Sequence, residues 1–435
     1  MAQSFRTIRG TFDILPDTST SEGTSIPGTP AWQYVESRIR EIMRRYDFEE
    51  VRTPILEETE LIARGVGAQT DIVSKEMFVV ERGDSSYVLR PEVTAPVVRA
   101  YLQHHLAQRG GVQKLYYIGP CFRAESPQKG RYRQFHQFGC EVLGADDARA
   151  DAEMISLMIA IYREFGITNT RLRINSLGGP ETRTAYREAL RSYLQPHAEE
   201  LTETSRKRLA TNPLRILDTK DEGERRLLAG APQLADHLDE VDRLHYDQVQ
   251  RYLDDLGVAF VEDPYLVRGL DYYGRTTFEL ESDDLGAQSA LAGGGRYDML
   301  ATELGAKQPV PAIGFAAGME RLFLAMSAAG VELPGRHVPD AFFVALGDDA
   351  AHWVFREAQR LREVGLHVGL DLKGRSMKAQ MREANRQEAR RVVIVGSDEL
   401  ERGKVAVRDM ASGEQEDIAL ERLADYLRTT TGETA

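Results

Sequence analysis

The sequence predicts an α+β protein of several domains, with an antiparallel sheet core and flanking helices, a helical insertion and a C-terminal α/β domain. A chain of 435 residues is too long for a single hydrophobic core, so two or three domains are expected. Residues 115–125 and 133–142 alternate in polarity around a Gly-containing loop, which predicts two antiparallel strands. Residues 178–256 show a charged helical pattern without a strong strand, which predicts a helical module.

The other elements of the core follow from local patterns along the chain. Residues 18–30 are rich in Ser, Thr, Gly and Pro and predict a loop, after which Pro30 opens a helix. Apolar residues at helical spacing predict a second helix over 152–162. Strand signals return over 266–280, and residues 314–326 predict a strand that leads into a helix.

The segment after Pro339 predicts a separate small α/β domain, because strand and helix patterns alternate in it. The short apolar run from Val392 to Val395 is typical of a strand that is buried on both faces. The expected elements, in order, are a strand at 341–346, a helix at 350–364, a strand at 367–372, a helix at 377–387 and a strand at 391–396.

Composition argues against membrane, secreted and zinc-binding classes of protein. No apolar run is long enough to span a bilayer, and the N-terminus lacks an apolar signal region, so a cytoplasmic protein without a membrane partner is expected. The only cysteines are Cys121 and Cys140, and neither CxxC nor HExxH occurs, so no disulfide scaffold and no protein-bound metal are expected. The net charge of −13 argues against a coat protein for nucleic acid, although a locally basic face could still bind RNA.

The predicted hairpin carries a cluster of polar groups. Because side chains alternate along a strand, one face of each strand is expected to present its functional groups together. These groups are Arg123 and Glu125 on the first strand and Phe135, Gln137, Gly139 and Glu141 on the second. The loop between the strands adds Lys129, Arg131 and Arg133, cations suited to a triphosphate. The alternative is a charged hairpin that is merely solvated.

Two further segments offer groups for a ligand. Glu92 and Thr94 lie two residues apart, and a carboxylate with a hydroxyl could hold a substrate ammonium; alternatively, Glu92 only favours the N-terminus of a helix. Arg321 stands early in its predicted helix, where a guanidinium could contact a purine or a phosphate. Alternatively, the small residues before Arg321 serve the packing of helix on strand.

Residues 266–273, LVRGLDYY, form the most informative stretch of the chain. Arg268 stands close to Tyr272 and Tyr273, and a permanently charged guanidinium beside hydroxyl-bearing rings suits an anion and a small polar ring. The three glycines at 293–295 allow a ligand to approach the backbone closely. They match neither a Walker A loop nor a dinucleotide-binding fingerprint.

In this combination and order, the segments resemble the histidyl-tRNA synthetases, a family of class II aminoacyl-tRNA synthetases. Motif 2 of that class resembles CFRAE and RYRQFHQFGCE, motif 3 resembles GFAAGMER, and motif 1, a dimer-interface element, resembles the segment around Pro54. The two histidine-specific motifs of the family are similar to LVRGLDYY and AGGGRYD. The resemblance extends over essentially the whole chain and includes a C-terminal domain similar to the class IIa anticodon-binding domain.

The resemblance implies an ATP-dependent ligase that forms histidyl-adenylate, releases pyrophosphate and transfers L-histidine to the 3′ end of tRNA(His). It implies a homodimer and Mg2+ that accompanies ATP. The implied catalytic residues are Arg123 and Arg268. The implied histidine contacts are Glu92, Thr94, Arg123, Gln137, Glu141, Arg268, Tyr272 and Tyr273. The implied ATP contacts are Arg123, Glu125, Arg131, Arg133, Phe135 and Arg321.

Four segments then divide the chain. Residues 1–177 and 259–333 are expected to form the two parts of the catalytic core, 178–258 the insertion, and 339–435 the anticodon-binding domain. In the last of these, basic residues recur every four positions, at Lys378, Arg382, Arg386 and Arg390. Along one helix side they would meet tRNA phosphates; the alternative is a solvated face partly paired by glutamates.

A rival function comes from another class of protein. Non-catalytic paralogues similar to the regulatory subunit of ATP phosphoribosyltransferase keep the core fold and bind histidine as a regulator. They typically lack intact catalytic arginines and the anticodon domain, whereas this chain has Arg123, Arg268 and Arg321 and about a hundred residues after the core.

Overall fold

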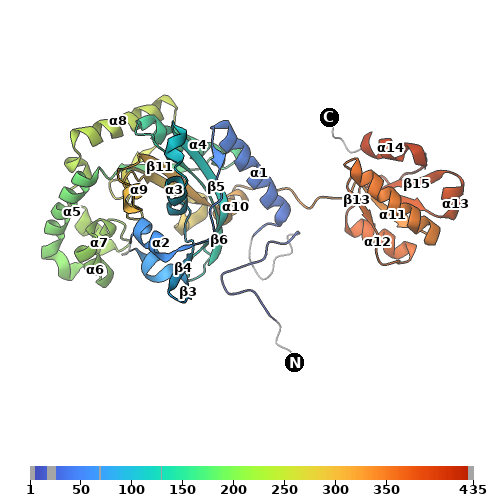
Figure 1. The fold of residues 1–435 in the computed structure, drawn as a ribbon, viewed down its shortest axis with the longest axis horizontal. Coiled ribbons are helices and arrows are strands. Elements are labelled where there is room, and N and C mark those ends of the chain that lie inside the picture. Colours follow the sequence, from blue (N-terminus) through green and yellow to red (C-terminus); the bar gives the residue numbers. More distant parts are fainter. Residues whose placement is uncertain (1–4, 17–25, 68–69, 129, 430–435) are drawn as a thin grey trace. The chain divides into compact units, whose positions relative to one another are not determined.

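A computed structural model of the chain describes residues 5–16, 26–67, 70–128 and 130–429 (Figure 1). The chain forms two compact units, Met1–Pro334 and Gly335–Ala435. In the described ranges, no helix combines the length and the apolar character needed to cross a membrane.

The core of the first unit is an eight-stranded sheet with the strand order β1-β5-β6-β11-β10-β9-β7-β8. The six central strands pair antiparallel, as predicted, and the short edge strands β1 and β8 pair parallel to their neighbours. In sheet order the bounds are β1 Glu49–Glu50, β5 Gln113–Phe122, β6 Gln134–Leu143, β11 Ala312–Gly318, β10 Ala290–Arg296, β9 Gly274–Glu281, β7 Arg171–Ser176 and β8 Val261–Glu262.

One face of this sheet is covered by helices. The covering helices are α1 (Thr29–Arg45), α4 (Ala148–Glu164), α8 (Glu240–Asp255) and α10 (Met319–Ala328), whose apolar residues share one core with β6, β10 and β11. Phe138, Cys140 and Val142 of β6 point into that core. Because side chains alternate along a strand, Gln137, Gly139 and Glu141 point to the opposite face of the sheet.

Smaller elements lie over the opposite face. They are α3 (Thr94–Gln103), α9 (Leu300–Glu303) and a three-stranded sheet with the order β2-β4-β3, which the sequence patterns did not predict. The strands are β2 Leu56–Glu58, β3 Phe78–Arg82 and β4 Ser85–Leu89, and helix α2 (Thr59–Val66) packs against this sheet.

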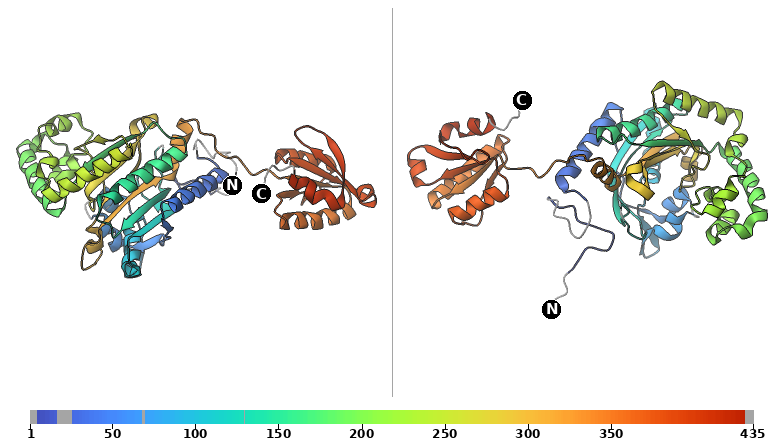
Figure 2. Two further views of the ribbon diagram at one scale, coloured as in Figure 1. Left: turned by 90° about the horizontal axis from the view of Figure 1, so that it is seen from above. Right: turned by 180° about the vertical axis from the view of Figure 1, so that it is seen from behind.

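The insertion between β7 and β8 is helical, as predicted, among the residues described. It contains α5 (Pro180–Leu194), α6 (Glu203–Thr211), α7 (Glu222–Leu228) and α8, joined by 3-10 turns at Gln195–Glu200, Pro213–Ile216 and Leu234–His237. These helices form one group at the side of the sheet core (Figures 1 and 2). Tyr186, Leu190 and Leu194 of α5 belong to the same apolar core as Tyr272 and Tyr273.

The second unit is a five-stranded sheet with the order β13-β12-β14-β15-β16. The parallel part is the predicted one, and comprises β12 (Ala341–Ala345), β13 (Val368–Leu370) and β14 (Arg391–Val395), with α11 (Asp348–Glu363) and α12 (Met377–Arg386). Four elements were not predicted: α13 (Ser397–Glu401), β15 (Lys404–Asp409), β16 (Gln415–Ala419) and α14 (Leu423–Thr429).

The structure corrects two expectations in the first unit. Residues 266–273 were expected to begin a strand, but they contain none. Successive residues of a strand point to opposite faces, whereas Tyr272 and Tyr273 are both buried and their ring centroids stand 4.6 Å apart. Strand β5 ends at Phe122, so Arg123 and Glu125 lie beyond it and strand alternation does not place them on one face. Most of the predicted loop at 18–30, residues 18–25, lies outside the described residues.

Candidate functional site

In the first unit, the open face of β6 presents a buried carboxyl group. Glu141 is 1% exposed and lies directly opposite Gly314 of β11. A Cβ atom on Gly314 would lie 1.7 Å from Glu141 Oε2, so only glycine leaves room for this side chain. Glycine at position 314 therefore keeps space for the Glu141 carboxyl group between two paired strands.

Two hydroxyl groups donate to the Glu141 carboxyl group. Thr94 Oγ1, at the start of α3, donates to Oε1 over 2.7 Å, and the Tyr297 hydroxyl donates to Oε2. Burial raises the pKa of Glu141 to about 8, against the lowering effect of these hydrogen bonds, and the charge of Glu92 adds to the rise. A carboxyl group that titrates near neutral pH, held by two donors, can exchange hydrogen bonds with a small polar ring.

Three tyrosine rings form a wall beside this carboxyl group. Tyr272 and Tyr273 stack tilted against each other, and the ring of Tyr297 lies 5.5 Å and 6.4 Å from theirs. Burial raises the pKa of Tyr273 to about 12, so its hydroxyl stays protonated and available as a donor at neutral pH.

Two residues of this cluster were missed by sequence reasoning. Tyr117 of β5 pairs with Gly139, and its buried hydroxyl has no hydrogen-bond partner within the described chain. A Cβ atom on Gly139 would lie 2.5 Å from that hydroxyl. Alternation along the predicted hairpin could have placed Tyr117 on this face, and Tyr297 follows Arg296 in the AGGGRYD segment.

Glu92 stabilises the N-terminus of helix α3, which was the alternative to ammonium binding. Its two carboxylate oxygens accept the backbone N–H groups of Thr94 and Ala95, at 2.8 Å and 2.9 Å, and so satisfy the start of α3. Burial raises the pKa of Glu92, and these hydrogen bonds oppose the rise. These contacts hold Glu92 beside Thr94, whose hydroxyl donates to Glu141. The charge of Glu92 also raises the pKa values of Glu141 and Tyr272.

Arg268 lies against the glycine run of β10. A Cβ atom on Gly293 would lie within 2.5 Å of three atoms of the Arg268 guanidinium group, so the glycine lets the cation lie flat on the strand. Nη1 pairs with Glu279 of β9, while Nε is buried without a hydrogen-bond partner among the described residues. The cation is therefore fixed on one side and retains an unused donor.

Arg123 occupies the space over an aromatic ring. Its Nε donates to the Pro91 carbonyl oxygen at 3.0 Å, and its guanidinium carbon stands 5.2 Å from the centroid of the Phe135 ring. Gln137 lies on the same face of β6, and its amide oxygen accepts a weak hydrogen bond from the Cys121 thiol at 3.3 Å. Arg123, Phe135 and Gln137 therefore lie between Glu141 and the hairpin loop, on the open face of the sheet.

The remaining cations gather around that loop. Arg131 Nη1 pairs with Glu125 Oε2 at 3.3 Å, and Arg133 Nε donates to the Glu125 carbonyl oxygen at 3.4 Å. Arg321, in the first turn of α10, donates from Nε to the Ala290 carbonyl oxygen at 2.6 Å. A Cβ atom on Gly130, beside Arg131, would lie 3.7 Å from Arg321 Nη1, so cations of the loop and of α10 lie in one region. Burial lowers the pKa of Arg321, and the charge of Arg131 adds to this effect. Lys129 lies outside the described residues.

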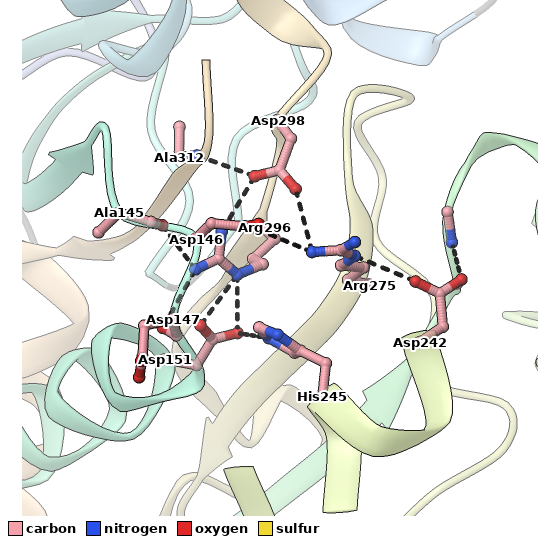
Figure 3. Close-up of polar contacts among 12 residues, drawn as sticks. Ala145, Asp146, Asp147, Asp151, Asp242, His245, Arg275, Arg296, Asp298 and Ala312 are labelled. Carbon is pink, nitrogen blue, oxygen red and sulfur yellow. Dashed lines mark hydrogen bonds and ion pairs between the residues drawn. The ribbon is translucent and has the colours of Figure 1, made fainter. Parts of the chain in front are cut away.

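Arg296, the arginine of the AGGGRYD segment, stabilises the fold through buried ion pairs (Figure 3). Arg296 is fully buried and pairs with Asp151 of α4 at 2.9 Å and with Asp298 at 3.1 Å. Asp151 also accepts from His245 of α8 at 3.2 Å. Arg296 therefore ties β10 to α4, and Asp151 links this pair to α8. The next residue, Tyr297, points toward Glu141.

The basic repeat of the second unit lies mostly on one helix. Lys378, Arg382 and Arg386 are exposed residues of α12. The helix ends at Arg386, so Arg390 lies beyond it, and the prediction that Arg390 lies on the same helix side is wrong. Arg386 pairs with Glu383, as the alternative of a partly paired face requires. Lys378 and Arg382 make no such ion pair among the described residues.

Comparisons with known proteins agree along the whole chain. A family model described as Histidyl-tRNA synthetase matches residues 29–322, and one described as Anticodon binding domain matches residues 340–430. The histidine–tRNA ligase of Chloroherpeton thalassium is 49% identical over 98% of both chains, and that of Bacillus cytotoxicus is 47% identical over 96% of this chain and 97% of its own. The crystal structure of apo histidyl-tRNA synthetase from S. aureus aligns over 98% of this chain and 100% of its own, with a TM-score of 0.82 and 38% identity.

Proposed function

This chain belongs to the histidyl-tRNA synthetase family, and from that premise we propose that it joins L-histidine to tRNA(His) at the expense of ATP. The observation that carries the proposal is the buried Glu141 carboxyl group between Thr94 and the tyrosine wall, because it suits an imidazole ring. The match of an anticodon-binding domain model to residues 340–430, together with Arg123, Arg268 and Arg321, disfavours the regulatory paralogue.

Recognition of histidine would use the donors and acceptors around Glu141. The imidazole would pair with Glu141 and with the Tyr273 hydroxyl, with Tyr272 adjacent, while Thr94, Glu92 and Gln137 would hold the ammonium group. An apolar amino acid would offer no hydrogen-bond partner to this carboxyl group or to the Tyr273 hydroxyl, and loss of the polar contacts that histidine would make there disfavours it by about 1–3 kcal/mol.

Activation would follow from positioning and charge. The histidine carboxylate attacks the α-phosphorus of ATP and pyrophosphate leaves, so negative charge develops between Arg268 and Arg123. Arg131, Arg133 and Arg321 would hold the outer phosphates, and Glu125 would lie near the base. Phe135 would stack under adenine, and the Arg123 guanidinium stands 5.2 Å from the centroid of that ring. Mg2+ would enter with ATP, as the counterion of its phosphates.

Transfer and assembly complete the proposal. A hydroxyl group of the terminal ribose of tRNA attacks the carbonyl carbon of the adenylate and AMP leaves, while Lys378, Arg382 and Arg386 meet tRNA phosphates. The chain would act as a cytoplasmic homodimer. The exposed apolar side chains of Ile55, Leu56, Val79 and Val80, on and beside the small sheet near the motif 1 segment, support an interface there.

ATP–pyrophosphate exchange tests the proposal. Histidine-dependent exchange is expected from the wild type and is expected to fall at least a hundredfold in Arg268→Ala, because one charge-stabilising group is worth about 2.7–4 kcal/mol. The control is Arg171→Ala, which removes an exposed arginine that pairs with the neighbouring β9 residue Glu281. Histidine binding without exchange in the wild type would favour the regulatory paralogue instead.

A further inference from the structure

The helical insertion holds the segment that carries the two histidine-site tyrosines. Residues 269–273 belong to no sheet or helix, so their backbone has few partners of its own. Three insertion side chains contact this segment: Arg215 Nη2 donates to the Gly269 carbonyl oxygen at 2.8 Å, Asn212 Nδ2 to Asp271 Oδ1 at 3.0 Å, and Arg183 Nη1 to the Tyr273 carbonyl oxygen at 2.7 Å.

A fourth contact joins the insertion to the residue that follows Gly274. Arg275 Nε pairs with Asp242 of α8 at 3.0 Å, and Asp242 also accepts from the Gly179 backbone N–H and from Thr182 Oγ1 at the start of α5 (Figure 3). Arg275 has a φ of +40°, in the left-handed region that a residue with a side chain rarely adopts. The surroundings must therefore hold this backbone, and one carboxylate links it to both ends of the insertion.

The contact from Arg183 is the one nearest to the chemistry. Its acceptor is the main-chain oxygen of Tyr273 itself, and its Nε is buried without a hydrogen-bond partner in the described chain. Burial lowers the pKa of Arg183, and the like charge of Arg187 adds to the effect. A half-buried guanidinium that donates to this carbonyl oxygen holds the Tyr273 backbone in position, and through it the ring.

We propose that the insertion is a part of the histidine pocket and that Arg183 is a positioning residue for Tyr273. The proposal deepens the proposed function and rests on it. Loss of the Arg183 contact should loosen the tyrosine wall and weaken histidine binding. ATP binding should change little, because Phe135 and Arg321 stand on β6 and α10, and none of the three insertion contacts reaches either residue.

The test compares Arg183→Ala with Arg191→Ala. Arg191 lies two turns further along α5 and is also half-buried, but it contacts only insertion residues, with Nε donating to the Leu209 carbonyl oxygen at 3.4 Å. In ATP–pyrophosphate exchange, Arg183→Ala is expected to raise the KM for histidine about tenfold or more, the effect of one charge-assisted hydrogen bond, with less than about a twofold change in the KM for ATP. Arg191→Ala should change neither, and Arg183→Lys, which keeps a donor, should fall between wild type and Arg183→Ala.

Two outcomes separate this inference from the proposed function. An unchanged KM for histidine in Arg183→Ala would overturn the positioning role, and so would an equal rise in the KM values for histidine and for ATP. The proposed function would survive either result as long as the wild type shows histidine-dependent exchange. Absence of exchange in the wild type would overturn the proposed function itself. Should Arg183→Ala fail to fold, Asn212→Ala removes the contact to Asp271 instead, and the same selective rise in the KM for histidine is expected, with an unchanged value overturning the inference.

Discussion

Replacement of Glu141 by glutamine should make the ligand-free protein more stable and less active. Burial moves the pKa of Glu141 from its ordinary value of 4.5 to about 8. At about 1.4 kcal/mol per pKa unit, the fully ionised carboxylate costs the folded state about 5 kcal/mol, and about 3 kcal/mol of this is present at pH 7. Glutamine has nearly the same shape as glutamate and carries no charge at any pH used for the measurement.

The direction of the pH dependence follows from proton binding. Between pH 4.5 and about pH 8, the folded protein keeps the Glu141 proton that the unfolded chain has lost. The free energy of unfolding of the wild type therefore falls as the pH rises through this window, and the fall ends above about pH 8. The stability advantage of Glu141→Gln should grow over the same window and then become constant.

Urea denaturation at about pH 5.5, 7 and 8.5 measures this difference. The chain has two tryptophans, Trp32 in the first unit and Trp353 in the second, so a Trp353→Phe background makes fluorescence report on the catalytic unit alone. The exposed residue Glu332 supplies a control, since Glu332→Gln should give a difference that does not vary with pH. A pH-independent difference for Glu141→Gln as well would refute the assignment of Glu141 as a buried, mostly neutral carboxyl group.

The same substitution should impair function. The kcat/KM for histidine in ATP–pyrophosphate exchange is expected to fall at least tenfold, because glutamine cannot ionise when histidine binds. It therefore cannot form the charge-assisted hydrogen bond to the imidazole, which contributes about 1.5–3 kcal/mol. Unchanged kinetics would exclude Glu141 from the recognition of imidazole. A gain in stability together with a loss of activity is what a functional buried acid should give.

Three further predictions test other parts of the structure. Gly314→Ala should abolish histidine-dependent exchange, because the new Cβ atom would lie 1.7 Å from Glu141 Oε2, and wild-type exchange by the variant would contradict this packing. Arg296→Ala should lower the free energy of unfolding by about 3–5 kcal/mol, since it leaves Asp151 buried and charged; a loss below about 1 kcal/mol in urea denaturation would contradict a structural role. Charge reversal at Arg382 and Arg386 should weaken tRNA binding and flatten its salt dependence in filter-binding titrations, whereas an unchanged slope would remove α12 from the tRNA surface.

Local patterns predicted the parts of the site that lie on regular elements. Alternation along β6 placed Phe135, Gln137, Gly139 and Glu141 on one face, and the apolar residues of the same strand face the helix layer. The strand-to-helix transition around Gly318 likewise placed Arg321 in the first turn of a helix. In a regular strand or helix, the position of a residue in the repeat sets the direction of its side chain, so the sequence alone indicates which face that side chain occupies.

The parts that were missed depend on contacts between distant segments. The 266–273 segment was expected to be a strand, but its conformation is set by Arg183, Asn212 and Arg215, which belong to the insertion. The strands β15 and β16 and the sheet β2-β4-β3 are short, and their patterns are weak without their partners. The capping of α3 by Glu92 was foreseen only as an alternative, because spacing alone does not distinguish a ligand contact from a helix cap.

Aminoacylation of tRNA(His) with labelled histidine tests the central claim most directly, because it requires the catalytic site and tRNA binding together. With ATP present, the full-length chain should attach histidine to tRNA(His), should not attach the other amino acids, and should lose the activity in Glu141→Gln and Arg268→Ala. Charging with a different amino acid, or histidine binding with no charging of tRNA(His), would contradict the account.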